Sequence, residues 1–270
     1  GRRVRREVPG SRTLLELLRT EHDGDAGIVY CLSRASVEKT ATWLATLTLV
    51  GSFGSSLAAD APESWDGLVQ VKPKRMDAAY VLPGADFRQY TKLMIDPTQV
   101  AFQKDWQKRI NDTRRMSDRV DDEQAQKILA AARTNFDDVF VEEFTKAGYT
   151  IVKEPGPDVL RVSTAVVNLY INAPDTMSAG RSYSFTAEAG EATLVLEVRD
   201  SLTNALMGRA LDRRETRRGA GMQMTTSVTN QTEFRALFRQ WASIAAKGLE
   251  ELKSHSPVPT DLKPGQKMKD

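Results

Sequence analysis

An apolar stripe with helical spacing, bounded by Asp121 and Gly148, constrains the fold more than any other feature of this sequence. Aspartate is a preferred residue before a helix and glycine a preferred residue after one, so this helix has a defined start and end. The apolar residues recur at intervals of three and four positions: Ala125, Ile128, Leu129, Ala132, Phe136, Val139, Phe140 and Phe144. A helix with one apolar side needs another element to bury that side, so the stripe predicts a packed partner surface.

The partner surface is predicted to be a sheet, with a second long helix beside the first. Residues 232–253 carry a second apolar helical face, which includes Trp241. Residues 200–204 have turn composition, so the strands on either side form a β-hairpin. Strand patterns cover residues 78–82, 92–95, 150–152, 159–171, 185–199 and 205–217. This order predicts an α+β fold with a mainly antiparallel sheet and two long helices packed on one face.

The charge balance and the scarcity of cysteine and histidine exclude several classes of function. The chain has 38 basic and 36 acidic residues, and eight of the basic and six of the acidic ones lie in residues 1–40. The rest of the chain is therefore neutral, which argues against nucleic acid as a partner of the main body. Cys31 is the single cysteine, and His22 and His255 are the two histidines. We predict no catalytic, cofactor-binding or metal-binding residues and no enzyme activity.

The segment between Lys39 and Ala59 has the pattern of a bacterial export signal. Its apolar run, Ala41 to Val50, is long enough for the core of a signal peptide and too short for a membrane span. Small residues at Ser56 and Ala58 predict cleavage between Ala58 and Ala59. A buried helix of a front domain is the alternative interpretation. The product would be periplasmic or outer-membrane-associated if the signal is used, and cytoplasmic if the N-terminal extension blocks export.

The sequence GIVYCLSR, residues 27–34, precedes this segment, and the sequence VEKTATWL, residues 37–44, overlaps its beginning. It resembles the second motor domain of a RecQ-type DNA helicase, and the resemblance covers about the first 45 residues. No ATP-binding loop, acidic ATPase motif or arginine finger follows it, so the resemblance implies a fragment without ATPase activity. Two unrelated coding segments joined near Glu38 and Lys39, by fusion or by a gene-assembly error, would explain both patterns.

The main body carries longer stretches that resemble a bacterial lipoprotein family. They run as VKPKRMDAAYVLPGADFRQYTKLMIDPTQVAFQKDW from Val71 to Trp106, as a second block from Arg133 to Ser201, and as ALDRRE from Ala210 to Glu215. These stretches resemble the family called domain of unknown function 3313, over about residues 65–253. The resemblance implies a cell-envelope protein. No cysteine follows residues 57–59, so the lipid-attachment signal is missing and a soluble periplasmic form is expected.

Two polar segments are candidate binding surfaces. The connection over residues 172–181 is long for a link between strands, and such loops often carry function. The charge run over residues 212–218 suits an anionic headgroup, a glycan or an acidic protein surface. Each segment also has a purely structural interpretation, as a turn held by Asn and Asp side chains and as a solvated strand face with cross-strand ion pairs. The candidate residues are Asn172, Asp175, Arg181, Arg213, Arg214 and Glu215.

The sequence thus divides into four predicted segments. They are a non-functional helicase-like fragment at 1–40, a signal-like segment at 41–58, an exported α+β domain at 59–253 and a disordered tail at 254–270. We expect a non-catalytic envelope protein that binds an unknown envelope protein or surface. A helicase-derived nucleic-acid-binding module without ATPase activity is the alternative. The sequence predicts no transmembrane span and no cofactor, and it leaves the oligomeric state open.

Overall fold

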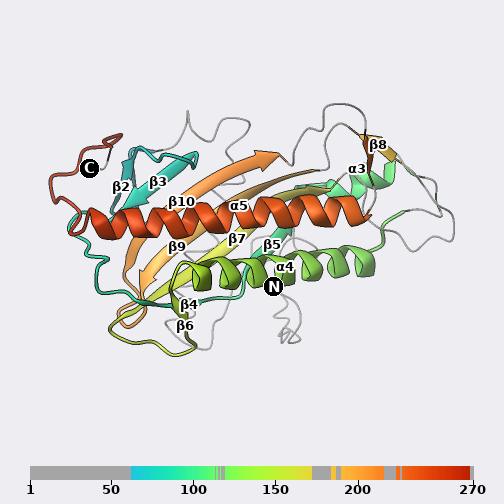
Figure 1. Ribbon diagram of the computed structural model, residues 1–270. Helices are drawn as coiled ribbons and strands as arrows, with labels where there is room; N and C mark the ends of the chain where they lie inside the picture. The colour runs from blue at the N-terminus through green and yellow to red at the C-terminus, as the bar shows by residue number, and fades with distance from the viewer. Residues whose placement is uncertain are drawn as a thin grey trace, which may run out of the picture. The chain divides into compact units, whose positions relative to one another are not determined.

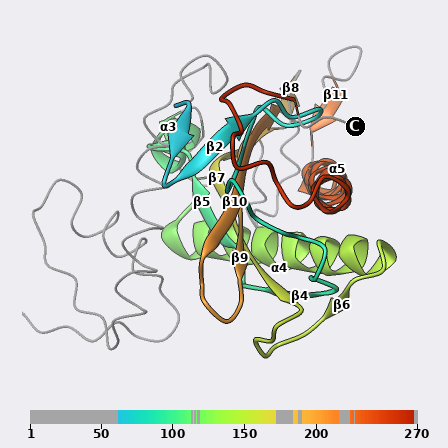
Figure 2. The ribbon, with the colours of Figure 1, turned by 90° about the vertical axis from the view of Figure 1, so that its left-hand side faces the viewer.

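Two long helices lie side by side on one face of a nine-stranded sheet (Figure 1). The computed structural model describes residues 62–267, apart from 113, 115, 117–118, 172–183, 187–189, 216–222 and 226. Most neighbouring strands are antiparallel, and β4 is parallel to both β6 and β7. The predicted α+β class, the mainly antiparallel sheet and the packing of both long helices on one face are confirmed (Figure 2).

The sheet has the order β1-β2-β3-β10-β9-β7-β4-β6, and β5 pairs with the second half of β7. Strands β8 and β11 form a separate two-stranded sheet. Every predicted strand region contains an observed strand, and β1, β2, β5 and β11 were not predicted. The strands are Ser64–Trp65 (β1), Leu68–Val71 (β2), Ala78–Val81 (β3), Lys92–Ile95 (β4), Gln99–Phe102 (β5), Thr150–Ile151 (β6), Val159–Ile171 (β7), Ser184–Thr186 (β8), Gly190–Asp200 (β9), Leu206–Glu215 (β10) and Gln223–Thr225 (β11).

The helices are α3 (Trp106–Asp112), α4 (Asp122–Lys146) and α5 (Ser227–Ser254). Helix α4 begins as predicted, because the Asp121 side chain accepts a hydrogen bond from the Gln124 backbone and the Gln124 side chain accepts one from the Asp121 backbone. It ends before Gly148, which has a φ of 94° that other residues rarely adopt. Helix α3, the one short helix among the residues described, was not predicted.

The core lies between the two long helices and the sheet. Phe136 and Phe140 of α4 are stacked with ring centroids 4.1 Å apart, and Phe136 meets the edge of Phe238 of α5 at 5.1 Å. These rings pack over the even-numbered residues of β9, from Ala192 to Val198, which are buried. Aromatic pairs of this kind contribute beyond the area that they bury. The predicted apolar faces of the two helices therefore meet each other as well as the sheet.

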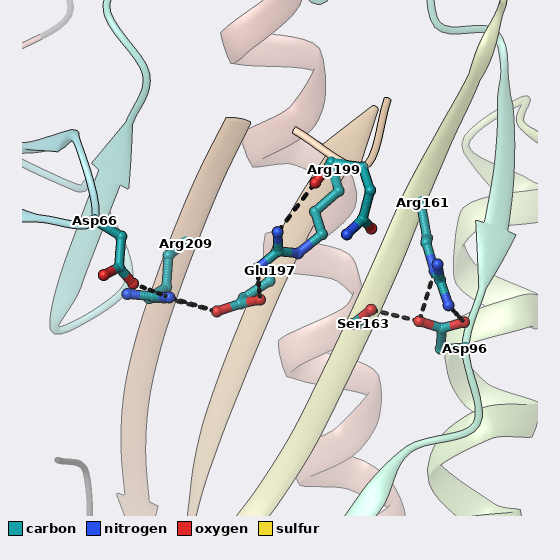
Figure 3. Close-up of polar contacts among 8 residues, drawn as sticks. Asp66, Asp96, Arg161, Ser163, Glu197, Arg199 and Arg209 are labelled. Carbon is teal, nitrogen blue, oxygen red and sulfur yellow. Dashed lines mark hydrogen bonds and ion pairs between the residues drawn. The ribbon is translucent and has the colours of Figure 1, made fainter. Parts of the chain in front are cut away.

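The opposite face of the sheet carries a row of buried charges (Figure 3). Arg209 of β10 lies between Asp66 and Glu197, with its Nη2 at 2.8 Å from Asp66 Oδ2 and 2.6 Å from Glu197 Oε1. Arg199 donates to the other Glu197 oxygen at 2.9 Å, and the Arg209 guanidinium lies 4.0 Å from the centre of the Trp65 ring. A buried charge needs such partners because it has lost its hydration. Removing one partner of a buried ion pair typically lowers the free energy of unfolding by about 3–5 kcal/mol.

A two-residue turn brings Asp66 to this row. Trp65 pairs with Leu68 across the β1–β2 hairpin, and the residues between them, Asp66 and Gly67, have φ values of 54° and 80°. Positive φ at both central residues defines the turn that Asp-Gly favours in tight hairpins. The Asp-Gly pair was therefore a sequence signal for a hairpin that the strand pattern alone did not reveal.

The C-terminal segment differs from the prediction of a disordered tail over 254–270. Val258 exchanges backbone hydrogen bonds with the strand-connecting segment at Gly84 and Ala85, at 2.9 and 2.8 Å. Further on, the Gly265 backbone donates to the Gln70 carbonyl and the Gln266 carbonyl accepts from the Lys72 backbone, at the C-terminal end of β2. Val258 and Leu262 are buried. The buried side chains of Val258 and Leu262 and these backbone hydrogen bonds thus order residues 255–267, although the segment contains three prolines and two lysines.

We predict that Phe140→Ala lowers the free energy of unfolding by about 3–5 kcal/mol, because it leaves a cavity among fully buried aromatic rings. The matched control is Val141→Ala on the next position of α4, where the side chain is 39% exposed and the loss should stay below about 1 kcal/mol. Urea unfolding followed by circular dichroism measures both. Equal losses in the two variants would mean that the face of α4 is assigned wrongly.

Candidate functional site

A cavity of about 640 Å³ lies between the C-terminal half of α5 and strands β2, β3 and β10. This volume falls within the range of small-molecule pockets, about 300–1,000 Å³. Its wall is mainly aliphatic, with Met76 from the β2–β3 connection and Leu249 and Leu252 from α5. The cavity is therefore an apolar compartment at the side of the main core.

Small residues of two paired strands form the floor of this cavity. Ala79 of β3 pairs with Ala210 of β10, and the next pair on the same face is Val81 with Gly208. The larger Leu196 and Val198 of β9 and Val71 of β2 flank them and line the walls. Apart from Val81, the residues of β3 and β10 that face the cavity are alanine and glycine, so α5 leaves the space above these residues unfilled.

Helix α5, which covers the cavity, also has one residue without a side chain on its cavity face. Gly248 of α5 lines the cavity, and a Cβ atom built on it meets no atom within 4 Å. By contrast, a Cβ atom on Gly208 would lie 3.1 Å from a methyl group of Val198. Gly248 is thus a place where a side chain can be added into open space, whereas Gly208 is tightly enclosed.

Exposed basic side chains surround the opening. Lys74 forms an ion pair with Glu251 at 2.7 Å. Glu251 is the one carboxylate that lines the cavity among the residues described. Arg209 of β10 also lines the cavity, and its guanidinium is paired with Asp66 and Glu197. The four remaining basic side chains make no ion pair with any residue that the structure describes. These four are Lys72, Arg75, Lys247 and Lys267.

A second hollow of about 420 Å³ adjoins the first at the N-terminal side of this stretch of α5. It shares Arg75 and Ile244 with the larger cavity and adds Arg214, Gln240 and Ser243. All of these except Ile244 carry hydrogen-bond donors. The apolar cavity therefore continues into a polar hollow that has two guanidinium groups.

The hollow is held in place by a buried carboxylate. Asp212 of β10 accepts hydrogen bonds from the indole of Trp241 at 2.7 Å and from Nε of Arg214 at 2.5 Å. Arg214 in turn donates to the backbone carbonyl of Arg75 at 2.9 Å. Burial raises the pKa of the Asp212 carboxyl, and the bonds from Arg214 and Trp241 act in the opposite direction. Asp212 thus links α5, β10 and the β2–β3 connection.

The structure separates the predicted site residues. Arg214 lines the polar hollow, whereas Arg213, the preceding residue of β10, points to the other face of the sheet and donates to Glu191 at 2.8 Å. Glu215 is exposed at the end of β10. The predicted loop residues Asn172, Asp175 and Arg181, the cleavage site Ala58-Ala59 and the helicase-like segment lie outside the residues described.

Sequence reasoning missed most of the residues around the cavity. The run Lys72-Pro73-Lys74-Arg75 between two strands was a signal for a basic rim, and Gly248 inside an apolar helical face was a signal for a gap. Neither signal identifies a cavity without the pairing of β3 with β10. Within the residues described, no group of three potential metal ligands occurs, and no helix there is long and apolar enough to cross a membrane.

The fold and site define a class: an α+β domain with a ligand-sized apolar pocket beneath one of two helices that cover its sheet. The chain belongs to the protein family of unknown function DUF3313, which matches residues 57–244. This confirms the predicted family for the main body. A comparison with curated proteins finds none that matches.

Solved structures of low sequence identity are also similar to the chain. The PelC dodecamer from Paraburkholderia phytofirmans has 10% identity and a TM-score of 0.33, covering 62% of this chain and 96% of that chain. A DUF330 protein from Xanthomonas campestris has 12% identity and a TM-score of 0.30, covering 67% and 94%. A putative neuraminyllactose-binding hemagglutinin homolog from Helicobacter pylori has 11% identity and a TM-score of 0.28, covering 64% and 95%.

We predict that Asp212→Asn lowers the free energy of unfolding by about 1.5–3 kcal/mol, because the buried Trp241 and Arg214 donors lose a charged acceptor. The control is Asp86→Asn, which removes an exposed carboxylate bound to Arg88 and should leave stability almost unchanged. Urea unfolding followed by tryptophan fluorescence compares the two. A loss in Asp212→Asn no larger than in the control would show that the carboxylate does not anchor α5.

Proposed function

We propose that this chain is a non-catalytic protein of the bacterial cell envelope that acts by binding, and that its binding site is the pocket beneath α5. The observation that carries the proposal is an apolar cavity of about 640 Å³ surrounded by exposed basic side chains. Such a site suits a ligand that has an apolar body and a negative charge. The signal-like segment before residue 59 supports export to the periplasm.

The apolar wall supplies the affinity in this proposal. Burial of apolar surface contributes roughly 25 cal/mol per Å², and a ligand in this pocket would be covered by aliphatic groups from α5 and the sheet. Val71, Leu196 and Leu249 also belong to the contiguous core of the domain, so the wall is already formed without a ligand. Preformed pockets lose less conformational entropy on binding than pockets that must be assembled.

The basic rim supplies the charge preference. Lys72, Arg75, Lys247 and Lys267 surround the opening and are not neutralised by any acid within the described part of the chain. Unpaired cations around an opening attract anions and repel cations, and the effect weakens with salt. We therefore expect a cationic amphiphile to bind this site more weakly than an anionic one.

Binding rather than catalysis is favoured by the side chains present. His255 is the single histidine after residue 22, and its Nδ1 atom is 2.7 Å from the Glu251 carbonyl in the last turn of α5. Among the residues that the structure describes, the lining offers lysine, arginine and one carboxylate, Glu251, which is paired with Lys74. General acid–base chemistry needs a titratable group free to reach a substrate, and this lining supports no such pair.

We predict that the fluorescent apolar anion anilinonaphthalene sulfonate binds the folded protein at one site and that Gly248→Leu abolishes this binding. The added side chain enters open space in the cavity, so it competes with the dye. Gly248→Ala is the matched control, because it adds one methyl group and should keep most of the binding. Alanine also has a higher helix propensity than glycine, so the control should be at least as stable as the parent.

Fluorescence titration with circular dichroism on each variant makes this test. Salt should weaken the binding, since the rim cations are exposed. Dye binding that is unchanged in folded Gly248→Leu would place the dye elsewhere and overturn the proposal.

A further inference from the structure

The pocket and the polar hollow together point to a more specific ligand. We propose that the site binds a lipid with a single acyl chain and a phosphate headgroup, an inference that rests on the proposed function. The acyl chain lies under α5 from Ile244 to Leu252, and the phosphate lies in the hollow between Arg75 and Arg214. Figure 1 shows α5 running across β3 and β10, the strands that carry the floor of this path.

The width of the pocket suits one acyl chain. Its floor is the pair of strands β3 and β10, where Ala79, Gly208 and Ala210 leave a furrow between the taller side chains of β2 and β9. Strands β2 and β9 are three spacings of about 4.8 Å apart, roughly 14 Å, and the side chains of Val71, Val81 and Leu196 narrow the space between them. Two chains side by side would require the space that Val71 and Leu196 occupy.

The length of the pocket suits the same ligand. From Ile244 to Leu252, α5 advances about 12 Å along its axis. One leaflet of a bilayer is about 15 Å thick in its hydrocarbon region, half of about 30 Å, which is the reach of one acyl chain. The pocket can therefore bury most of one chain, with the headgroup at the Ile244 end, where the hollow begins.

The hollow has the donors that a phosphate requires. Arg214 uses Nε for Asp212 and Nη2 for the Arg75 carbonyl, which leaves its Nη1 without a hydrogen bond to any residue described. The Arg75 guanidinium is exposed and makes no hydrogen bond or ion pair there either. Gln240 and Ser243 of α5 complete the wall. Two guanidinium groups present planar forks that match phosphate oxygens, and one of them is fixed by a buried carboxylate.

The experiment measures displacement of anilinonaphthalene sulfonate by four probes below their micelle concentrations. Three share a twelve-carbon chain and differ in headgroup: dodecyl phosphate, dodecanoate and neutral dodecyl maltoside. Inorganic phosphate is the fourth, and it separates a headgroup site from a site for free phosphate. We expect dodecyl phosphate to bind most tightly, dodecanoate next, and inorganic phosphate alone not to displace the dye.

The variants locate each part of the ligand. Arg75→Gln should weaken dodecyl phosphate about tenfold or more, because a charge-assisted hydrogen bond is lost, and should change dodecyl maltoside less than twofold. Lys127→Gln, on the exposed face of α4, removes the same charge elsewhere and should change neither. Gly248→Leu, which is expected to lose dye binding, should also bind none of the three amphiphiles when each is titrated directly by calorimetry.

The outcomes separate this inference from the function beneath it. If the dye binds and Gly248→Leu blocks it, but dodecyl maltoside competes as well as dodecyl phosphate, the headgroup assignment is overturned and the pocket remains. An equal effect of Arg75→Gln and Lys127→Gln on dodecyl phosphate also overturns it. Displacement by inorganic phosphate alone would show a free-phosphate site instead. Absence of dye binding to the parent protein overturns the proposed function and this inference together.

Discussion

The hydrogen bonds at Asp212 fix the position of α5, and the rest of the site depends on that position. Trp241 is fully buried and is bound to the sheet through this carboxylate, not only by apolar packing. Apolar contacts alone would allow α5 to shift along the sheet. A buried carboxylate that accepts two hydrogen bonds instead fixes one position of the helix relative to β10. Once Trp241 is placed, residues 244–252 of the same helix must pass over β3 and β10. The pocket is thus a consequence of where the helix is anchored.

A helix anchored near its middle, at Trp241, leaves space over the small side chains that its C-terminal half crosses. Ala79, Gly208 and Ala210 lie under α5, and Gly248 faces them from the helix. Well-packed interiors rarely keep a void of this size, because each unfilled methyl group forfeits dispersion and transfer energy. The charged row around Arg209 and Glu197 on the opposite face stabilises the same strands from behind (Figure 3). The sheet can therefore carry a pocket on one face because its other face is held by specific polar contacts.

Much of the fold could be read from the sequence because local signals were unambiguous. The Asp121 cap, the stripe that ends at Gly148 and the turn that begins at Asp200 each left one interpretation, and each lies where it was expected. Short edge strands were harder, since two to four residues carry little periodicity. The order of residues 255–267 depends on Val258 and Leu262 finding distant partners, which composition does not record. Of the candidate site, the sequence indicated Arg214, but the pocket needed the register of β3 against β10.

The central claim is that an apolar anion enters the space between α5 and the β3–β10 pair, and photo-crosslinking tests it most directly. A dodecyl phosphate analogue with a diazirine at its terminal carbon would be irradiated with the full chain, and mass spectrometry would identify the labelled peptides. The account predicts labels within residues 244–252 of α5 and residues 79–81 of β3, and their loss in Gly248→Leu. Labels confined to the exposed face of α4, or labelling that Gly248→Leu leaves unchanged, would contradict it.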